Sequence, residues 1–172
     1  MDAIIRACGP DDAAALALVG QATFLETYAS ALPAQDILHH CRHEHSEARY
    51  AGWLGRPGYD FRLAEATEGR APVGYVMNAP PDLPVVLQAG DVELKRIYLL
   101  HRFHGSGLGP RLMAAAIEAA QAAGASRLLL GAKNDNRRAL AFYARQGFVQ
   151  IGERKFRVGG NDYDDVVLAR PL

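Results

Sequence analysis

A glycine-rich segment is the part of this sequence best suited to chemistry. Residues 104–109 read His-Gly-Ser-Gly-Leu-Gly, between an apolar, β-branched segment and a long alanine-rich segment. A strand, a glycine loop and a helix in this order can bind a phosphate, because glycines let main-chain N–H groups approach an anion and the helix N-terminus adds positive partial charge. Spaced glycines also occur in ordinary turns, so the surrounding elements must decide between the two interpretations.

Length and composition indicate a globular chain. Its 172 residues suffice for one domain, spanning residues 1–172, with a substantial core. The 19 basic residues balance the 19 acidic ones, which argues against binding to nucleic acid or to a membrane surface. Cys8 and Cys41 are too few for a disulfide framework. With no signal peptide pattern and no apolar run long enough to cross a bilayer, we expect a cytoplasmic protein.

Hydrophobic periodicity and turn residues predict alternating strands and helices in one mixed α/β domain. A proline-containing loop is expected at 79–90, and a turn around 159–161. A cluster of N-cap candidates at 134–136 precedes the last expected helix, which runs through residue 146. The expected strands are 3–7, 61–65, 73–77, 91–100, 127–130, 148–156 and 164–169, and the other helices are 13–28, 36–54 and 105–123.

Two further features accompany the loop. Residues 136–143 read Asn-Arg-Arg-Ala-Leu-Ala-Phe-Tyr, with Gly147 and Phe148 after them, and the expected elements follow the order β-α-α-β-β-β-α-β-α-β-β. With these features, nearly the whole chain resembles the GNAT N-acetyltransferase superfamily. The pyrophosphate loop of that family is usually Gln/Arg-x-x-Gly-x-Gly/Ala, so His104 departs from it at one position.

The resemblance implies a strongly twisted mixed sheet that splays between its fourth and fifth strands, is flanked by about four helices, and holds acetyl-CoA in the gap. The main chain of Ile97, Tyr98 and Leu99 would pair with the pantetheine arm. Asn136 would position that arm from the opposite side of the gap. The pyrophosphate would be held by His104, Gly105, Ser106, Gly107, Leu108 and Gly109.

The resemblance also implies a proton donor. Tyr143 ends the 136–143 motif and would donate a proton or a hydrogen bond to the departing CoA thiolate. Its alternative role is that of a half-buried aromatic residue that packs its helix.

The general base is assigned on weaker grounds. Glu93 stands eleven positions before His104, the spacing of the catalytic glutamate in some members of this family. Strand alternation places Glu93, Lys95 and Ile97 on one face of the strand and Leu94, Arg96 and Tyr98 on the other. Glu93 could therefore face the cleft and accept a proton from the amine, directly or through water. The alternative is a solvated ion pair between Glu93 and Lys95.

A narrower resemblance concerns the acceptor. Segments 93–98, 23–28 and 156–163 are similar to a branch of the family related to the PaiA spermidine acetyltransferase. It implies a substrate site that contains Phe24, Thr27, Tyr28 and Glu93. Nearby acids would suit a polyamine, although exposed acids on an amphipathic helix explain them equally well. These acids are Glu26, Asp36, Glu44 and Glu47.

A histidine and cysteine cluster precedes the first expected hairpin. His39 with His43, and Cys41 with His45, have the spacing of metal ligands on a helix, but the two pairs point about 200° apart. One site could not use all four residues. We therefore expect no metal and assign these side chains to a solvated or acceptor-site face.

The predicted function is acetyl transfer from acetyl-CoA to a primary amine of a small molecule, with a polyamine as one candidate, by direct attack in a ternary complex. Two alternatives stay open: an acetyltransferase of protein N-termini or lysines, and a non-catalytic acyl-CoA-binding module that senses the cofactor or regulates a partner. The family resemblance also implies that this protein could form a homodimer.

Overall fold

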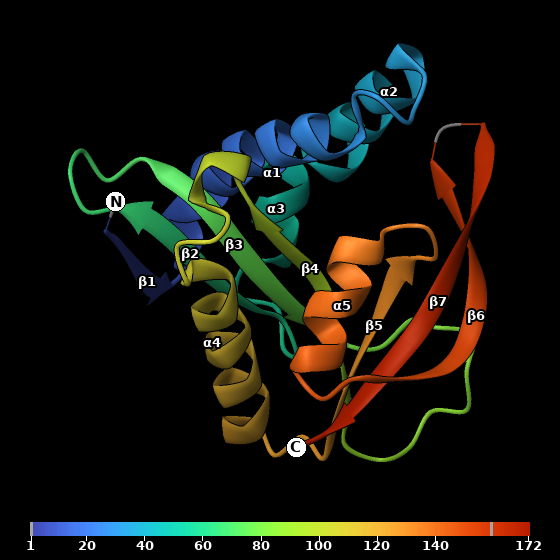
Figure 1. The fold of residues 1–172 in the computed structure, drawn as a ribbon. Coiled ribbons are helices and arrows are strands. Elements are labelled where there is room, and N and C mark those ends of the chain that lie inside the picture. Colours follow the sequence, from blue (N-terminus) through green and yellow to red (C-terminus); the bar gives the residue numbers. More distant parts are fainter. Residues whose placement is uncertain (1, 159) are drawn as a thin grey trace.

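The computed structural model describes residues 2–158 and 160–172 and contains one seven-stranded sheet with the order β1-β2-β3-β4-β5-β7-β6 (Figure 1). Neighbouring strands are antiparallel except β4 and β5, which are parallel. The strands are β1 (Ala3–Ala7), β2 (Asp60–Ala66), β3 (Pro72–Ala79), β4 (Asp91–Leu99), β5 (Arg127–Lys133), β6 (Val149–Val158) and β7 (Asn161–Pro171). Each expected strand is present; the turn expected around 159–161 includes Gly159, which lies outside the described residues.

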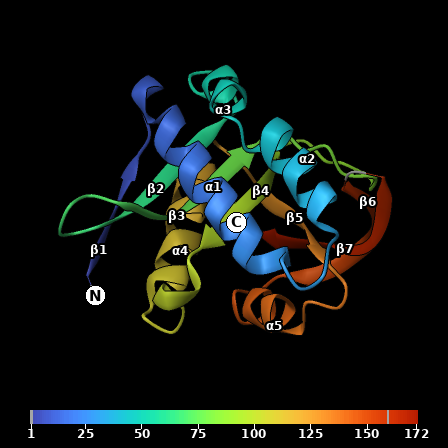
Figure 2. The same ribbon diagram turned by 90° about the horizontal axis from the view of Figure 1, so that it is seen from above.

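Helices cover both faces of the sheet (Figure 2). One face packs against α4 and α5, and the other packs against α1 and α3. The buried side chains of α4 include Leu112 and Met113, which are wholly shielded from solvent. Within the described residues, none of the helices has both the length and the apolar character needed to span a bilayer. The helices are α1 (Ala13–Tyr28), α2 (Ala34–Glu44), α3 (Glu47–Trp53), α4 (Leu108–Ala122) and α5 (Arg137–Arg145), with 3-10 turns at Pro10–Asp12 and His101–Phe103.

The sheet parts between β4 and β5, which confirms the expected splay. The two strands pair over only three positions, from Asp91 opposite Arg127 to Glu93 opposite Leu129. Beyond Glu93 the edge of β4 that faces β5 has no strand partner, while its other edge continues to pair with β3 as far as Leu99. Figure 1 shows α5 in front of this opening. The gap therefore exposes strand edges inside the sheet.

A bulge in β4 corrects the predicted alternation. Met77 pairs with Arg96 and the next residue of β3 pairs with Leu94, so Lys95 is an extra residue in β4. Leu94 consequently packs with Ile97 against the α4 side, whereas Tyr98 packs against the α1 side. The prediction that Ile97 shares a face with Glu93 was wrong, because one inserted residue reverses the alternation beyond it.

The expected helix 36–54 is in fact two helices, so the described residues form five α-helices rather than about four. The first ends at Glu44, and Ser46 begins the second by accepting a hydrogen bond from the N–H of Arg49 at 3.2 Å. A serine N-cap satisfies a free N–H of a new helix, so it favours a break at this point. The helix expected from 105 begins at Leu108 instead, because Gly105 and Gly107 have φ values of 80° and 84°.

Candidate active site

The glycine loop has the geometry of an anion site. The left-handed backbone at Gly105 and Gly107 is readily available to glycine but strained for other residues. Among the described residues, the N–H groups of Gly105, Gly107 and Gly109 have no hydrogen-bond partner. The segment 105–107 is exposed and leads directly into α4. Free N–H groups at the start of a fifteen-residue helix can bind a phosphate.

His104 connects the loop to the strand before it. Its Nε2 lies 2.9 Å from the carbonyl oxygen of Leu99, which can only accept, so Nε2 carries the hydrogen. Burial lowers the pKa of His104. The other ring nitrogen, Nδ1, is buried and has no partner among the described residues. A neutral imidazole thus connects the glycine loop to the end of β4.

The register of β4 decides which main-chain groups face the gap. The N–H of Leu100 bonds to the carbonyl of Val73, and residues in an antiparallel pair alternate between facing the partner strand and facing away. The N–H and C=O groups of Tyr98 therefore point toward β3. Those of Ile97 and Leu99 point into the gap, where an extended ligand could pair with them.

Three phenols from three elements meet at the gap. Tyr28 ends α1, Tyr98 lies on β4 and Tyr143 lies on α5. Burial raises the pKa of Tyr98 to about 12, and burial followed by the effect of Tyr98 raises the pKa of Tyr143. The Tyr143 hydroxyl has no hydrogen-bond partner among the described residues and is not among the atoms fully shielded from solvent. Tyr143 is therefore a protonated hydrogen-bond donor.

Asn136 begins α5, as its place in the sequence predicts. Its Oδ1 accepts a hydrogen bond from the N–H of Ala139 at 3.1 Å. Neither hydrogen of the side-chain amide nitrogen is used in this bond, so both can be donated to another partner.

Glu93 stands at the closed end of the gap. It is 2% exposed, so the expected ion pair with Lys95 is present but Glu93 is buried rather than solvated. Its Oε2 accepts a hydrogen bond of 2.8 Å from the N–H of Asp82 in the proline-containing loop and lies 3.8 Å from Nζ of Lys95. One carboxylate oxygen thus holds the loop, and the other is free to bind water.

Of the substrate residues expected on α1, the structure brings only Tyr28 to the gap. Phe24 is 1% exposed and stacks on His40 with ring centroids 4.3 Å apart. The Thr27 hydroxyl donates to the carbonyl of Thr23, within its own helix. Phe24 and Thr27 therefore serve packing and local hydrogen bonding in this arrangement.

Three of the acids considered for a polyamine site already have partners. Glu26 accepts from the N–H of His101 at 2.9 Å, Asp36 accepts from Asn161 at 2.5 Å, and Glu44 pairs with Arg96 at 3.2 Å. Glu47 lies in the first turn of α3. These contacts connect elements to one another, so these acids provide no row of free carboxylates at the gap.

The histidine cluster divides between surface and core. His39 and His43 lie together on α2, with ring centroids 4.4 Å apart. His40 and His45 are buried, which corrects the expectation of a solvated face. His45 Nδ1 lies 2.8 Å from the hydroxyl of Tyr50. No group of three or more metal-binding side chains occurs among the described residues.

One buried acidic residue, one strand beyond the gap, escaped the sequence analysis. Asp165 lies on β7 and is 6% exposed, with its carboxylate bound to Arg154. The alternation of side chains along this strand could have revealed it. Asp165 occupies the same face of β7 as Val167 and Ala169, and both of these residues are buried. A lone acid on the buried face of a strand marks a candidate functional group.

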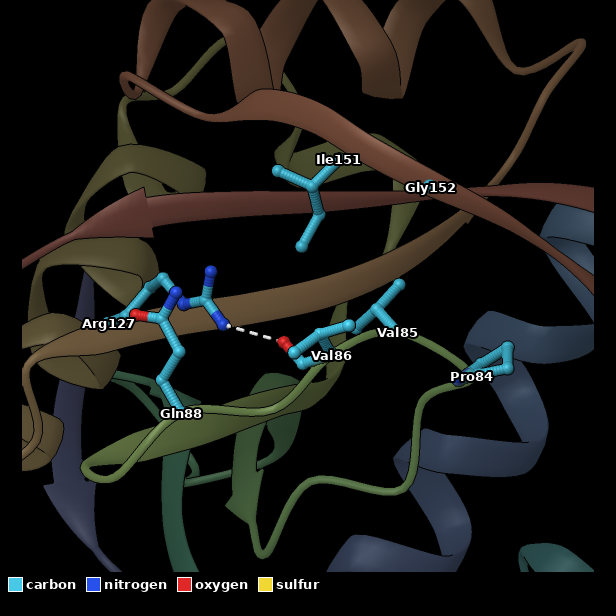
Figure 3. A pocket seen from close by; sticks show the side chains of 7 residues that line it. All are labelled: Pro84, Val85, Val86, Gln88, Arg127, Ile151 and Gly152. Carbon is cyan, nitrogen blue, oxygen red and sulfur yellow. Dashed lines mark hydrogen bonds between the residues drawn. The ribbon is translucent and has the colours of Figure 1, made fainter.

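A cavity of about 670 Å³ lies elsewhere, between the proline-containing loop, the start of β5 and the start of β6 (Figure 3). The cation in its lining, Arg127, is held by both oxygens of Asp91 at 2.8 and 2.7 Å and also donates to the carbonyl of Val86. Other lining residues include Val85 and Ile151. It lies at the paired end of β4 and β5, so it is separate from the gap.

Comparison with known proteins agrees with this geometry. The family model for the acetyltransferase (GNAT) family matches residues 23–148. An uncharacterized N-acetyltransferase of Mycobacterium tuberculosis is 36% identical over 161 residues, covering 94% of this chain and 98% of the relative. The PaiA N-acetyltransferase of Thermoplasma acidophilum, solved with coenzyme A, has a TM-score of 0.80 at 20% identity, with 100% of both chains covered. A GNAT acetyltransferase of Streptococcus pneumoniae has a TM-score of 0.73 at 25% identity, covering 99% of this chain and 100% of its own.

The parted sheet and the glycine loop define an acyl-CoA-dependent transferase fold. The chain belongs to the acetyltransferase (GNAT) family and is an acyltransferase of the N-acetyltransferase type. The resemblance seen in the sequence is thereby confirmed.

Proposed function

We propose that this enzyme transfers the acetyl group of acetyl-CoA to the primary amine of a small molecule by direct attack in a ternary complex. One observation carries the proposal: the free N–H groups of the glycine loop, the unpaired edge of β4 and the open Tyr143 hydroxyl adjoin a single gap. These groups match the diphosphate, the amide-containing arm and the leaving thiolate of an acyl-CoA.

Main-chain groups supply most of the proposed contacts with the donor. Gly105, Gly107 and Gly109 would bind the pyrophosphate through their N–H groups. Ile97 and Leu99 would pair with the pantetheine amides as a strand does, and the free amide nitrogen of Asn136 would act from the α5 side. These contacts require little side-chain ordering, because the sheet and loop hold the backbone in place.

The proposed chemistry is a transfer of one acyl group. An alkylamine has a pKa near ~10 and must lose a proton before its nitrogen attacks the thioester carbon. Glu93 would accept that proton through water, since one of its oxygens is free. The C–N bond forms and the C–S bond breaks. Tyr143 stabilises the departing thiolate by donating a hydrogen bond or a proton.

Calorimetry with acetyl-CoA, followed by thiol release with a panel of small amines and peptides, tests the proposal. We expect saturable acetyl-CoA binding and CoA release with at least one small amine. Peptides used far better than every free amine would instead favour a protein acetyltransferase. Binding without transfer to any acceptor would favour a sensor module, and absence of binding would refute the assignment.

Replacing Tyr143 with phenylalanine tests the proposed proton donor. The variant keeps the packed ring but loses the hydroxyl, so kcat should fall by about 100-fold, the lower range for loss of a general acid. The Kd for acetyl-CoA should change by less than about threefold. Steady-state kinetics and calorimetry on the same preparation measure both quantities, and an unchanged kcat would exclude this role.

A further inference from the structure

Asp165 lies across the gap from the part of β4 assigned to the acyl-CoA. Ile97 stands four positions after Glu93, and Lys133 stands four positions after Leu129, where Glu93 and Leu129 are the last paired residues. Because Lys95 is an extra residue in β4, Ile97 and Lys133 lie about one strand position apart in height on the two sides of the gap. Lys133 pairs directly with Asp165 of β7. This places the carboxylate near the level of the β4 segment whose main chain faces the gap, beyond the paired end of β4 and β5.

The Asp165 side chain is on the α1 side of the sheet. Val166 and Leu168 pack against the α4 and α5 side, whereas Val167 belongs to the cluster on the opposite side. Strand alternation puts Asp165 with Val167. Tyr163, two positions before Asp165 and on the same face of β7, packs in the cluster that contains Tyr28 and Tyr98. Tyr143 comes from the α5 side, so Tyr143 and Asp165 approach the gap from opposite faces.

The sheet is built to hold this carboxylate by one oxygen. Arg154, opposite Asp165 on β6, donates from Nε and from a terminal nitrogen to Oδ2, both at 3.1 Å. The guanidinium of Arg154 extends over β7 and reaches Gly131 of β5. A Cβ at position 131 would overlap the guanidinium. The second oxygen, Oδ1, has no partner among the described residues and is not among the fully shielded atoms.

The surrounding charges leave this carboxylate available to a cation. Burial raises the pKa of Asp165, against the opposing effects of Arg154 and Lys133. Lys133 itself is bound to Asp135 at 2.9 Å, and its Nζ lies 5.7 Å from the ring centre of Tyr163. A buried carboxylate with an unused oxygen gains most from a cationic partner that can also donate hydrogen bonds.

Resting on the proposed function, we infer that Oδ1 of Asp165 binds the ammonium group of the acceptor and directs it toward the thioester. The acceptor class is therefore a cationic alkylamine, presented beside the phenols of Tyr28 and Tyr98. Asp165 binds and orients the ammonium. Because Glu93 lies several strand positions away, the proton would reach it through a chain of waters, and the C–N bond then forms as the C–S bond breaks.

The test compares Asp165→Asn with wild type on two probes, benzylamine, which is a cation at neutral pH, and aniline, which is neutral. Asparagine can still accept from Arg154 but carries no charge. We expect kcat/KM for benzylamine to fall by at least about 30-fold, as for loss of one partner of a buried charged pair. Any turnover of aniline should change by less than about threefold, and the Kd for acetyl-CoA should be unchanged.

Two further variants separate recognition from folding. Asp165→Glu retains the charge and should recover much of the benzylamine activity that Asp165→Asn loses. The matched control is Asp164→Asn, because Asp164 is adjacent, 60% exposed and paired with Lys155 at the surface. It should leave both probes unaffected.

Each result either supports or overturns the inference. It is supported if Asp165→Asn loses activity with benzylamine and Asp165→Glu recovers much of that activity. Undiminished benzylamine turnover in Asp165→Asn, or equal loss with both probes, overturns it. Wild-type enzyme that binds acetyl-CoA yet does not acetylate benzylamine also overturns it, whereas failure to bind acetyl-CoA defeats the proposed function itself.

Discussion

At the scale of single residues, His104 shows how a departure from the usual motif can retain its geometry. The family motif usually has glutamine or arginine at this position, and both can donate a hydrogen bond. His104 also donates, from Nε2 to the carbonyl of Leu99. Because burial lowers the pKa of the ring, it acts as a neutral donor. The substitution therefore retains a hydrogen-bond donor at this position.

His104→Leu should weaken acetyl-CoA binding. It removes one hydrogen bond, which contributes about 1 kcal/mol, so the Kd should rise by about fivefold. His104→Gln restores a donor and should remain within about twofold of wild type. Calorimetric titration of wild type and the two variants measures the Kd for acetyl-CoA. Equal Kd values in all three proteins would show that the hydrogen bond from His104 to Leu99 does not support binding.

At the scale of elements, β4 depends on close contact with β3. Gly74 on β3 lies opposite Leu99, and a Cβ there would be 2.7 Å from the carbonyl oxygen of Tyr98. The nearest contact is a main-chain atom, which cannot move aside as the side chain of Leu99, at 2.8 Å, could. Gly74 thus fixes the position of the strand whose other edge faces the gap.

Gly74→Ala should displace β4 as well as destabilise the fold. Overpacking of this kind costs about 1–3 kcal/mol, and the Kd for acetyl-CoA should increase because the strand edge moves. The control is Gly52→Ala on α3, where a Cβ meets nothing within 4 Å. That change should stabilise the helix by about 0.5–1 kcal/mol. Urea denaturation measures the change in stability, and calorimetry measures the Kd for acetyl-CoA. If folded Gly74→Ala binds acetyl-CoA with an unaltered Kd, Gly74 does not fix the position of the β4 edge.

At the scale of the whole molecule, buried histidines couple stability to pH. Burial lowers the pKa of His45 to about 2 and that of His40 to about 4. The unfolded chain protonates these rings below about pH 6.5, whereas the folded chain keeps them neutral. The unfolded state then binds more protons, so stability is lost as the pH falls below that value.

For His45 this loss is about 2 kcal/mol at about pH 5, since each pH unit below 6.5 contributes about 1.4 kcal/mol. Denaturant unfolding at about pH 7.5 and pH 5 measures it. His45→Asn removes the titrating group, so its stability should fall by about 2 kcal/mol less than that of wild type over the same interval. A parallel decline in both proteins would assign the pH dependence to other groups.

Local sequence determined the cofactor side of the site. The glycines at 105 and 107, the N-cap at Asn136 and the order of strands and helices each follow from residues a few positions apart. Such signals act within one turn or one strand, so they can be read without knowing the rest of the fold. Together with the family resemblance, they were sufficient to predict the parted sheet.

Only the tertiary structure decided the arrangement of the residues on the proposed acceptor side. The bulge at Lys95 arises from pairing with β3, and the burial of Glu93 arises from a loop that folds back over it. Asp165 becomes an oriented carboxylate because Arg154 crosses Gly131, which belongs to a different strand. Desolvation and cross-strand contacts join residues far apart in the chain, so local patterns cannot specify them.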